Sequence, residues 1–125
     1  MLDVIMTMTT CEGTLDSVQK IVKSPNYPSN YQGWYNCEWS LRAVRGKQIT
    51  LNVEEFSTDS DTGSDGLIIF DGEDSNANTI RKMAGNLGQQ SITSSANAVF
   101  LQFTSGLRES GKGFLLRYKF KDGKY

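Results

Sequence analysis

Residues 24–31 read SPNYPSNY, and the sequence CEWSLRA follows shortly afterwards at residues 37–43. The two prolines, Pro25 and Pro28, fix their own φ angles and push the residue before each of them toward an extended conformation. In residues 37–43 apolar and polar side chains alternate, which is the period of a β-strand with one buried face. This stretch therefore predicts a rigid loop followed by a half-buried strand.

The same two-residue period recurs along the rest of the chain. It is clearest in residues 114–121 (FLLRYKFK) and 49–54 (ITLNVE), and Phe56 then falls out of phase. The phase change predicts a β-bulge near Glu54 and Glu55.

Two further runs, residues 67–70 and 98–103, are apolar on both faces and indicate central strands covered from both sides. The one candidate helical turn lies over residues 75–83. With twelve glycines between the runs, the pattern predicts an all-β fold, an antiparallel β-sandwich or jelly roll.

Length and charge limit the possible functions. The chain has 125 residues, enough for one domain, with 38% hydrophobic residues and a formal net charge of -1. Lysines and arginines are spread along the sequence, which argues against a nucleic-acid partner. Residues 1–10 have no basic leader and are interrupted by Asp3, so we interpret them as an N-terminal extension or added segment. No run is long enough to be a transmembrane segment.

Cysteine and histidine content bears on catalysis. The chain has two cysteines, Cys11 and Cys37, and no histidine. The cysteine count alone leaves a disulfide and two free thiols equally open. The lack of histidine removes the usual nucleophile pairs and nearly every catalytic zinc site. Acid pairs such as Glu54 with Glu55 could serve a glycosidase, but neighbouring strand residues point to opposite faces unless a bulge turns them. We therefore expect no enzymatic activity.

The order of these motifs resembles the CUB domain family. The matching landmarks, in chain order, are Cys11 with Gly13, the SPNYP loop at 24–28, Cys37 two residues before Trp39, the Asp71–Gly72 turn, and the closing strand that begins at Gly113–Phe114. The resemblance covers about residues 11–120 and leaves 121–125 as a C-terminal tail. It implies an antiparallel β-sandwich of jelly-roll type, a disulfide between Cys11 and Cys37 with Trp39 packed beside it, and an extracellular location, secreted or in an ectodomain.

The sequence departs from the family pattern at a second disulfide. Most members carry another cysteine pair, whose positions here are occupied by Thr62–Gly63 and Ala84. The second bridge is therefore missing. Without a covalent link, we expect residues 57–66 to be more mobile.

A second departure concerns calcium, which many members of the family bind at one end of the sandwich. Asp59 and Asp65 match two of the acidic positions, whereas the third falls on Gly106. Calcium takes six to eight oxygens and usually more than one carboxylate, so this loss weakens the site, unless Asp61 or Glu109 substitutes. We expect no bound cofactor and interpret these residues as a solvated acidic loop.

The resemblance implies a module for protein–protein binding or adhesion within a larger protein. We expect a protein partner to bind near Asp59, Asp61 and Asp65, together with residues 105–111. The alternative is a glycan-binding module. In that case an aromatic group would stack on sugar rings if it is exposed rather than packed under the loop, and its members are Tyr27, Tyr31, Trp34 and Tyr35. The sequence does not specify the partner, the parent protein or the oligomeric state.

Overall fold

A computed structural model describes residues 4–9, 11, 14–30, 35–58, 66–105 and 111–123, with only the backbone described for 4–9. The described residues form eleven β-strands and no helix. The helical turn considered for residues 75–83 is wrong for its second half, because Thr79–Met83 forms strand β7 and pairs with β6. The predicted all-β class is confirmed.

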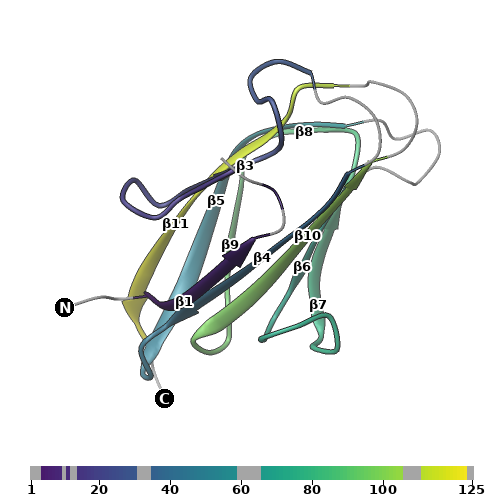
Figure 1. Ribbon diagram of the computed structural model, residues 1–125. Coiled ribbons are helices and arrows are strands. Elements are labelled where there is room, and N and C mark those ends of the chain that lie inside the picture. Colours follow the sequence, from purple (N-terminus) through teal and green to yellow (C-terminus); the bar gives the residue numbers. More distant parts are fainter. Residues whose placement is uncertain are drawn as a thin grey trace.

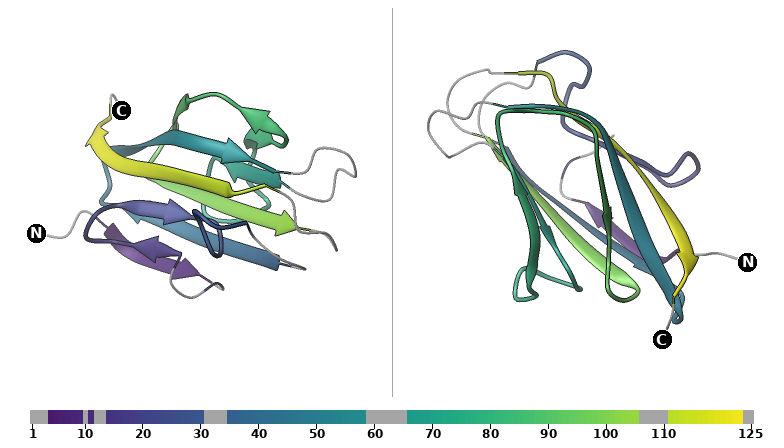
Figure 2. Two further views of the ribbon diagram at one scale, coloured as in Figure 1. Left: turned by 90° about the horizontal axis from the view of Figure 1, so that it is seen from above. Right: turned by 180° about the vertical axis from the view of Figure 1, so that it is seen from behind.

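The strands form two antiparallel sheets that lie face to face as a sandwich (Figure 1). The first sheet has the order β1-β4-β10-β6-β7, with bounds Val4–Thr9, Tyr35–Ala43, Ala98–Ser105, Gly66–Phe70 and Thr79–Met83. The second has the order β2-β3-β11-β5-β8, with bounds Leu15–Asp16, Ile21–Lys23, Gly113–Asp122, Lys47–Ser57 and Asn86–Leu87. Strand β9 (Gln90–Thr93) also pairs with β5. Figure 2 shows the two sheets as separate layers.

The hydrophobic core fills the space between the sheets. Its largest side chains are the aromatic rings of Trp39, Phe103 and Phe114, all fully buried. Phe114 meets the other two edge-on, with ring centroids 5.9 Å from Trp39 and 5.4 Å from Phe103. Edge-to-face rings at this spacing stabilise a core beyond their buried area. The alternation predicted for β4 and β11 is therefore confirmed.

Strands β6 and β10 were predicted to be covered on both faces, and this is only partly right. Leu67, Ile69 and Leu101 face the core and are fully buried. On the outer face Phe70 packs against Phe100 and is 8% exposed, whereas Phe100 itself stays partly exposed. No third layer covers this face among the described residues, so side chains alone shield it.

The predicted bulge lies in β5. Leu115 of β11 pairs with Glu55 and Leu116 pairs with Val53, so Glu54 has no partner in the ladder. The extra residue lets Val53 and Phe56 both point into the core, where they are 1% and 4% exposed. A bulge leaves one residue unpaired and bends its strand. Phe56 is out of phase in the sequence for this reason.

The two ends of the sandwich differ. At one end, here called the turn end, lie the short connections at 44–46, 71–78 and 94–97, and the first and last described residues (Figure 1). Val4 pairs with Ala43 there, and the Gly123 N–H donates to the Gly46 carbonyl. The opposite end, here called the loop end, carries residues 24–30 and the strand ends that flank the segments 59–65 and 106–110.

Candidate interaction surface at the loop end

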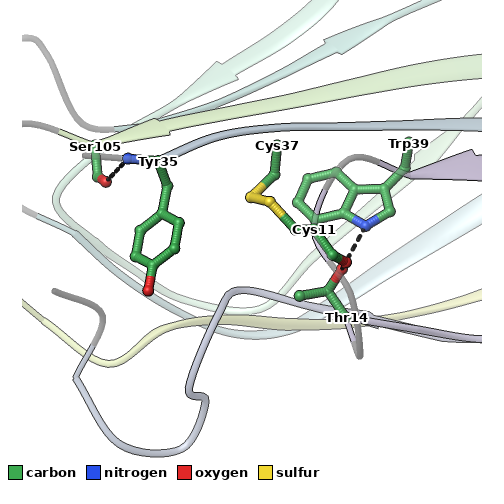
Figure 3. Close-up of a disulfide and its surroundings, with 6 residues drawn as sticks. All are labelled: Cys11, Thr14, Tyr35, Cys37, Trp39 and Ser105. Carbon is green, nitrogen blue, oxygen red and sulfur yellow. Dashed lines mark hydrogen bonds between the residues drawn. A yellow bond between two sulfur atoms is a disulfide. The ribbon is translucent and has the colours of Figure 1, made fainter. Parts of the chain in front are cut away.

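The disulfide and Trp39 lie between the sheets next to the loop end. Cys11 and Cys37 are bonded, with Cα atoms 5.4 Å apart, as the resemblance implied. Trp39 lies two residues along β4 and therefore shares the inward face with Cys37. Its indole Nε1–H donates to Thr14 Oγ1 at 3.0 Å, which satisfies the one polar atom of this buried side chain. Figure 3 shows this group between the sheets.

Ser24 anchors the loop that begins the SPNYPSNY stretch. Its side chain is fully buried, and its Oγ accepts a hydrogen bond of 2.9 Å from the Phe114 N–H. The Ser24 N–H in turn donates to the Phe114 carbonyl at 3.1 Å. The loop is thus tied to the first residues of β11. Nothing in a single sequence distinguishes this serine from its neighbours, so sequence reasoning missed it.

Tyr27 and Tyr35, the described members of the aromatic group, lie in different surroundings. Tyr27 is partly buried and its hydroxyl donates to Glu55 on β5 of the second sheet. Tyr35 begins β4 of the first sheet and packs partly buried against the core. Its N–H donates to Ser105 Oγ at 2.9 Å (Figure 3). Tyr31 and Trp34 lie outside the described residues. The surroundings of the two described tyrosines therefore fit side chains packed under the loop better than a single exposed surface on which sugar rings stack.

The acidic candidates Asp59, Asp61 and Asp65 also lie outside the described residues, but the strand ends that flank them are described. Thr104 pairs with Gly66, the first residue after this segment. Gly111 follows the other segment and approaches Ser57 so closely that an added Cβ would lie 2.3 Å from the Ser57 carbonyl oxygen. Its φ of +76° also favours glycine. The strands on either side of the segments 59–65 and 106–110 thus all begin or end at the loop end of the sandwich.

The expectation that the calcium site is weakened stays a prediction. Within the described ranges no group of three or more His, Cys, Asp or Glu side chains is placed to hold a metal ion. Asp59 and Asp65 fall outside those ranges, and glycine at 106 offers no carboxylate. The donor set of the sequence therefore does not fit a full calcium site.

Hydrogen bonds join the segments that a second disulfide would link. The Thr58 N–H donates to the Gly85 carbonyl at 3.0 Å, and the Gly85 N–H donates to Thr58 Oγ1 at 2.9 Å. Ser57 Oγ donates to Asn86 Oδ1 at 2.6 Å one residue away. Most of residues 57–66, for which we expected greater mobility, lie outside the described residues. The first two, Ser57 and Thr58, are held by these hydrogen bonds.

The acid pair on β5 has structural partners. The predicted bulge turns these residues, so Glu54 and Glu55 both reach the outer surface, the exception that the sequence analysis allowed. Glu54 Oε2 accepts a 2.6 Å hydrogen bond from Arg117 Nε, and Glu55 accepts one from Tyr27. Each carboxylate thus holds a neighbouring element in place, a different arrangement from two carboxyl groups that flank a shared substrate.

Comparisons with known proteins agree with this fold. The family model of the CUB domain matches residues 11–118. The chain is 36% identical over 118 residues to neuropilin-2 of Rattus norvegicus, covering 90% of this chain and 13% of that protein. It is 35% identical over 112 residues to cubilin of Canis lupus familiaris, covering 86% of this chain and 3% of that protein. The chain thus spans a small part of these relatives' length.

Solved structures show the same architecture. The full extracellular region of zebrafish Gpr126/Adgrg6 matches 82% of this chain with a TM-score of 0.72 and 23% identity, over 13% of that chain. The CUB1-EGF-CUB2 domain of human MASP-1/3 also matches 82% of this chain with a TM-score of 0.72, at 19% identity and over 41% of that chain. At these identities the likeness concerns the fold.

Proposed function

This chain belongs to the CUB domain family, and we propose that it is an extracellular, non-catalytic module that binds a protein partner through its loop end. One observation carries the proposal: the flanks of 59–65 and 106–110 meet at the loop end, opposite Val4 and Gly123, the first and last described residues. Chain segments that leave the domain from Val4 and Gly123 therefore start at the end opposite the loop end. Loops on a rigid scaffold carry binding function more often than its strands.

An extracellular location is supported by the disulfide, because such bonds persist in oxidising compartments. Among the described residues no helix is long and apolar enough to cross a membrane. CUB domains are generally non-catalytic modules, and the acids of β5 have structural partners here. The family and the structural roles of these acids favour binding over catalysis.

The chemistry of the loop end favours a basic partner. Asp59, Asp61 and Asp65 lie within seven consecutive residues of one connecting segment. A partner with lysine or arginine side chains gains mainly in association rate from exposed charges of this kind. The association therefore slows as salt rises, because the Debye length is about 10 Å at 0.1 M ionic strength.

The test measures association rates by surface plasmon resonance against a partner taken from a screen of extracellular domains. Asp65→Lys should lower the association rate and its salt dependence, whereas the matched reversal Asp74→Lys at the turn end should change little. Unchanged binding by Asp65→Lys with lost binding by Trp34→Ala would contradict the proposal and favour the aromatic group.

A second test concerns calcium, which should barely raise the melting temperature of the domain relative to EDTA. A rise of several degrees that Asp65→Ala removes would show that Gly106 does not disable the site.

A further inference from the structure

A row of basic side chains runs along the outer face of the second sheet. Leu116 and Tyr118 of β11 point into the core, so the alternating residues Arg117, Lys119 and Lys121 point outward and are exposed. Lys23 of β3 continues the row because it pairs with Leu115, the next outward residue of β11. Lys23, Arg117, Lys119 and Lys121 are called the basic track below. With a rise of about 3.3 Å per residue, the track is roughly 20 Å long.

Most of the charge on the basic track has no local counterion. Arg117 is paired with Glu54 at 2.6 Å. Among the described residues, however, Lys23, Lys119 and Lys121 form no ion pair. Of the other acids nearby, only Asp122 has a cationic partner, Lys47 at 3.2 Å. Glu55 and Asp16 keep their charge, but hydrogen bonds from Tyr27 and from the N–H groups of Val18 and Gln19 hold their carboxylates toward these neutral donors. Three lysines on one face thus lack an ion-pair partner within the described part of the chain, although the whole chain carries a net charge of -1.

The β5 residues that pair with Arg117, Lys119 and Lys121 have uncharged hydrogen-bonding side chains. On β5, Asn52 lies opposite Arg117, Thr50 opposite Lys119, and Gln48 opposite Lys121. No large hydrophobic side chain is strongly exposed along the track; within the part of the chain that the structure describes, only Val18 at the β2–β3 turn is, at 88%. Protein interfaces depend on aromatic and apolar anchors at their centre. A flat, charged and polar face suits a hydroxyl-rich polyanion better.

One end of the basic track opens into a groove. This groove has a volume of about 660 Å³ and lies between the β2–β3 hairpin and the loop that contains Tyr27. Its lining is mainly polar and includes one carboxylate, with Thr14, Asp16, Ser17, Gln19, Lys23 and Tyr27 beside apolar Leu15, Ile21, Pro28 and Leu115. Hydrogen-bonding groups beside some apolar surface in a concave site suit a small polar ligand such as a sugar ring. Because Lys23 and Leu115 line it, the groove continues the basic track.

From these two observations we propose that the outer face of the second sheet binds a sulfated or carboxylated polysaccharide. The chain of sugar rings lies along β11, with its anionic groups beside Lys23, Lys119 and Lys121. The rings near Lys23 enter the groove and pack on its apolar lining. This site is separate from the loop end, so a protein partner and the polysaccharide can bind together.

The test measures the affinity of the purified domain for a heparin-derived oligosaccharide, in EDTA, with a neutral dextran of equal length as control. Wild type should bind the sulfated oligosaccharide and not the dextran, and binding should weaken as salt rises. The double variant Lys119→Gln/Lys121→Gln should bind about tenfold more weakly, since it loses two exposed charge contacts. Lys23→Gln should lose less, and Asp65→Lys should not weaken binding at all. The Asp65→Lys variant thus distinguishes binding at the basic track from binding at the loop end.

A matched control decides whether the arrangement matters or only the total charge. Arg81 and Lys82 are exposed on β7, the edge strand of the first sheet, so Arg81→Gln/Lys82→Gln removes the same charge at a place away from the basic track. An equal loss in the two double variants would overturn the proposal, as would no binding by wild type. Competition by polyglutamate at equal strength would show that the track takes an acidic polypeptide instead. Unchanged melting temperatures in all variants confirm that the effects are local.

Discussion

Two pairs of segments near the loop end are joined in different ways. Cys11 and Cys37, 26 residues apart, are linked by a disulfide, whereas Thr58 and Gly85, 27 residues apart, are linked by two hydrogen bonds. A disulfide stabilises mainly by restricting the unfolded chain. Hydrogen bonds act only in the folded state and compete with water. The first junction therefore persists during local fluctuations, and the second can open without unfolding the domain.

This difference has a consequence for binding. The Thr58–Gly85 junction lies immediately before the acidic segment 59–65, whereas the disulfide lies beside Trp39 between the sheets (Figure 3). A junction held only by hydrogen bonds lets Thr58 and Gly85 separate at a modest cost in free energy when a partner binds. The covalent junction keeps the sandwich rigid while they separate.

Breaking the covalent junction should have the largest effect on stability. Cys37→Ser removes the disulfide and should lower the free energy of unfolding by about 3–4 kcal/mol, because the unfolded chain regains the freedom of the closed loop. Urea denaturation measures the change, and reduced wild type should show a similar loss. Two reactive thiols in unfolded, unreduced protein would contradict the structure and the oxidising compartment with it.

Breaking the hydrogen-bonded junction should have a smaller effect. Thr58 is 7% exposed, and Thr58→Val keeps its shape while leaving the Gly85 N–H without its acceptor. Losing the partner of a buried donor costs about 1–2 kcal/mol. Hydrogen exchange of the Gly85 amide should become faster, while Thr79→Val at the exposed sheet edge should leave it unchanged. If exchange at Gly85 does not respond, the junction is not held by this hydroxyl.

The smallest effect is expected where a buried hydroxyl has no partner. Tyr118 is 2% exposed, and its hydroxyl forms no hydrogen bond with the described residues, unlike that of Thr58. Tyr118→Phe removes this unpaired group and should raise the free energy of unfolding, by up to about 1 kcal/mol. Urea denaturation at pH 7 gives the sign, and a clear loss of stability would show that the hydroxyl has a partner.

The same residue predicts a dependence on pH. Burial, and secondarily the charge of Asp16, raise the pKa of Tyr118 above its ordinary value of 10.0. The folded state then keeps a proton that the unfolded state releases, so this contribution to stability is complete below about pH 10 and is lost as the pH rises toward the folded-state pKa. Wild type should therefore lose more stability than Tyr118→Phe between pH 9 and pH 11. Equal losses in both would contradict the raised pKa.

Local patterns were sufficient to predict much of the fold. The alternation in β4 and β11 predicted their buried faces, and the phase of Phe56 predicted the bulge, because side-chain direction along a strand follows directly from position. The pairing of Cys11 with Cys37 came from the family resemblance instead. The Thr58–Gly85 junction could not be predicted, because it depends on two loops meeting in space.

The basic track shows a different limit. Whole-chain composition suggested evenly spread charges, and this concealed three outward positions on one strand, at Arg117, Lys119 and Lys121. The signal was present in the alternation itself, since every second residue of β11 faces outward. What the sequence could not show was that the acids nearby have other partners.

The position of the disulfide also determines how the domain would respond to mechanical tension. Strand β1 starts at the turn end, where Val4 pairs with Ala43, and its pairing with β4 continues up to Thr9 and Trp39. A pull on the N-terminal side therefore peels β1 from β4 one residue pair at a time. Peeling stops at Cys11, where the covalent bond transfers the load to Cys37 on the buried strand β4. The domain can thus lengthen by only a short segment before its core bears the force.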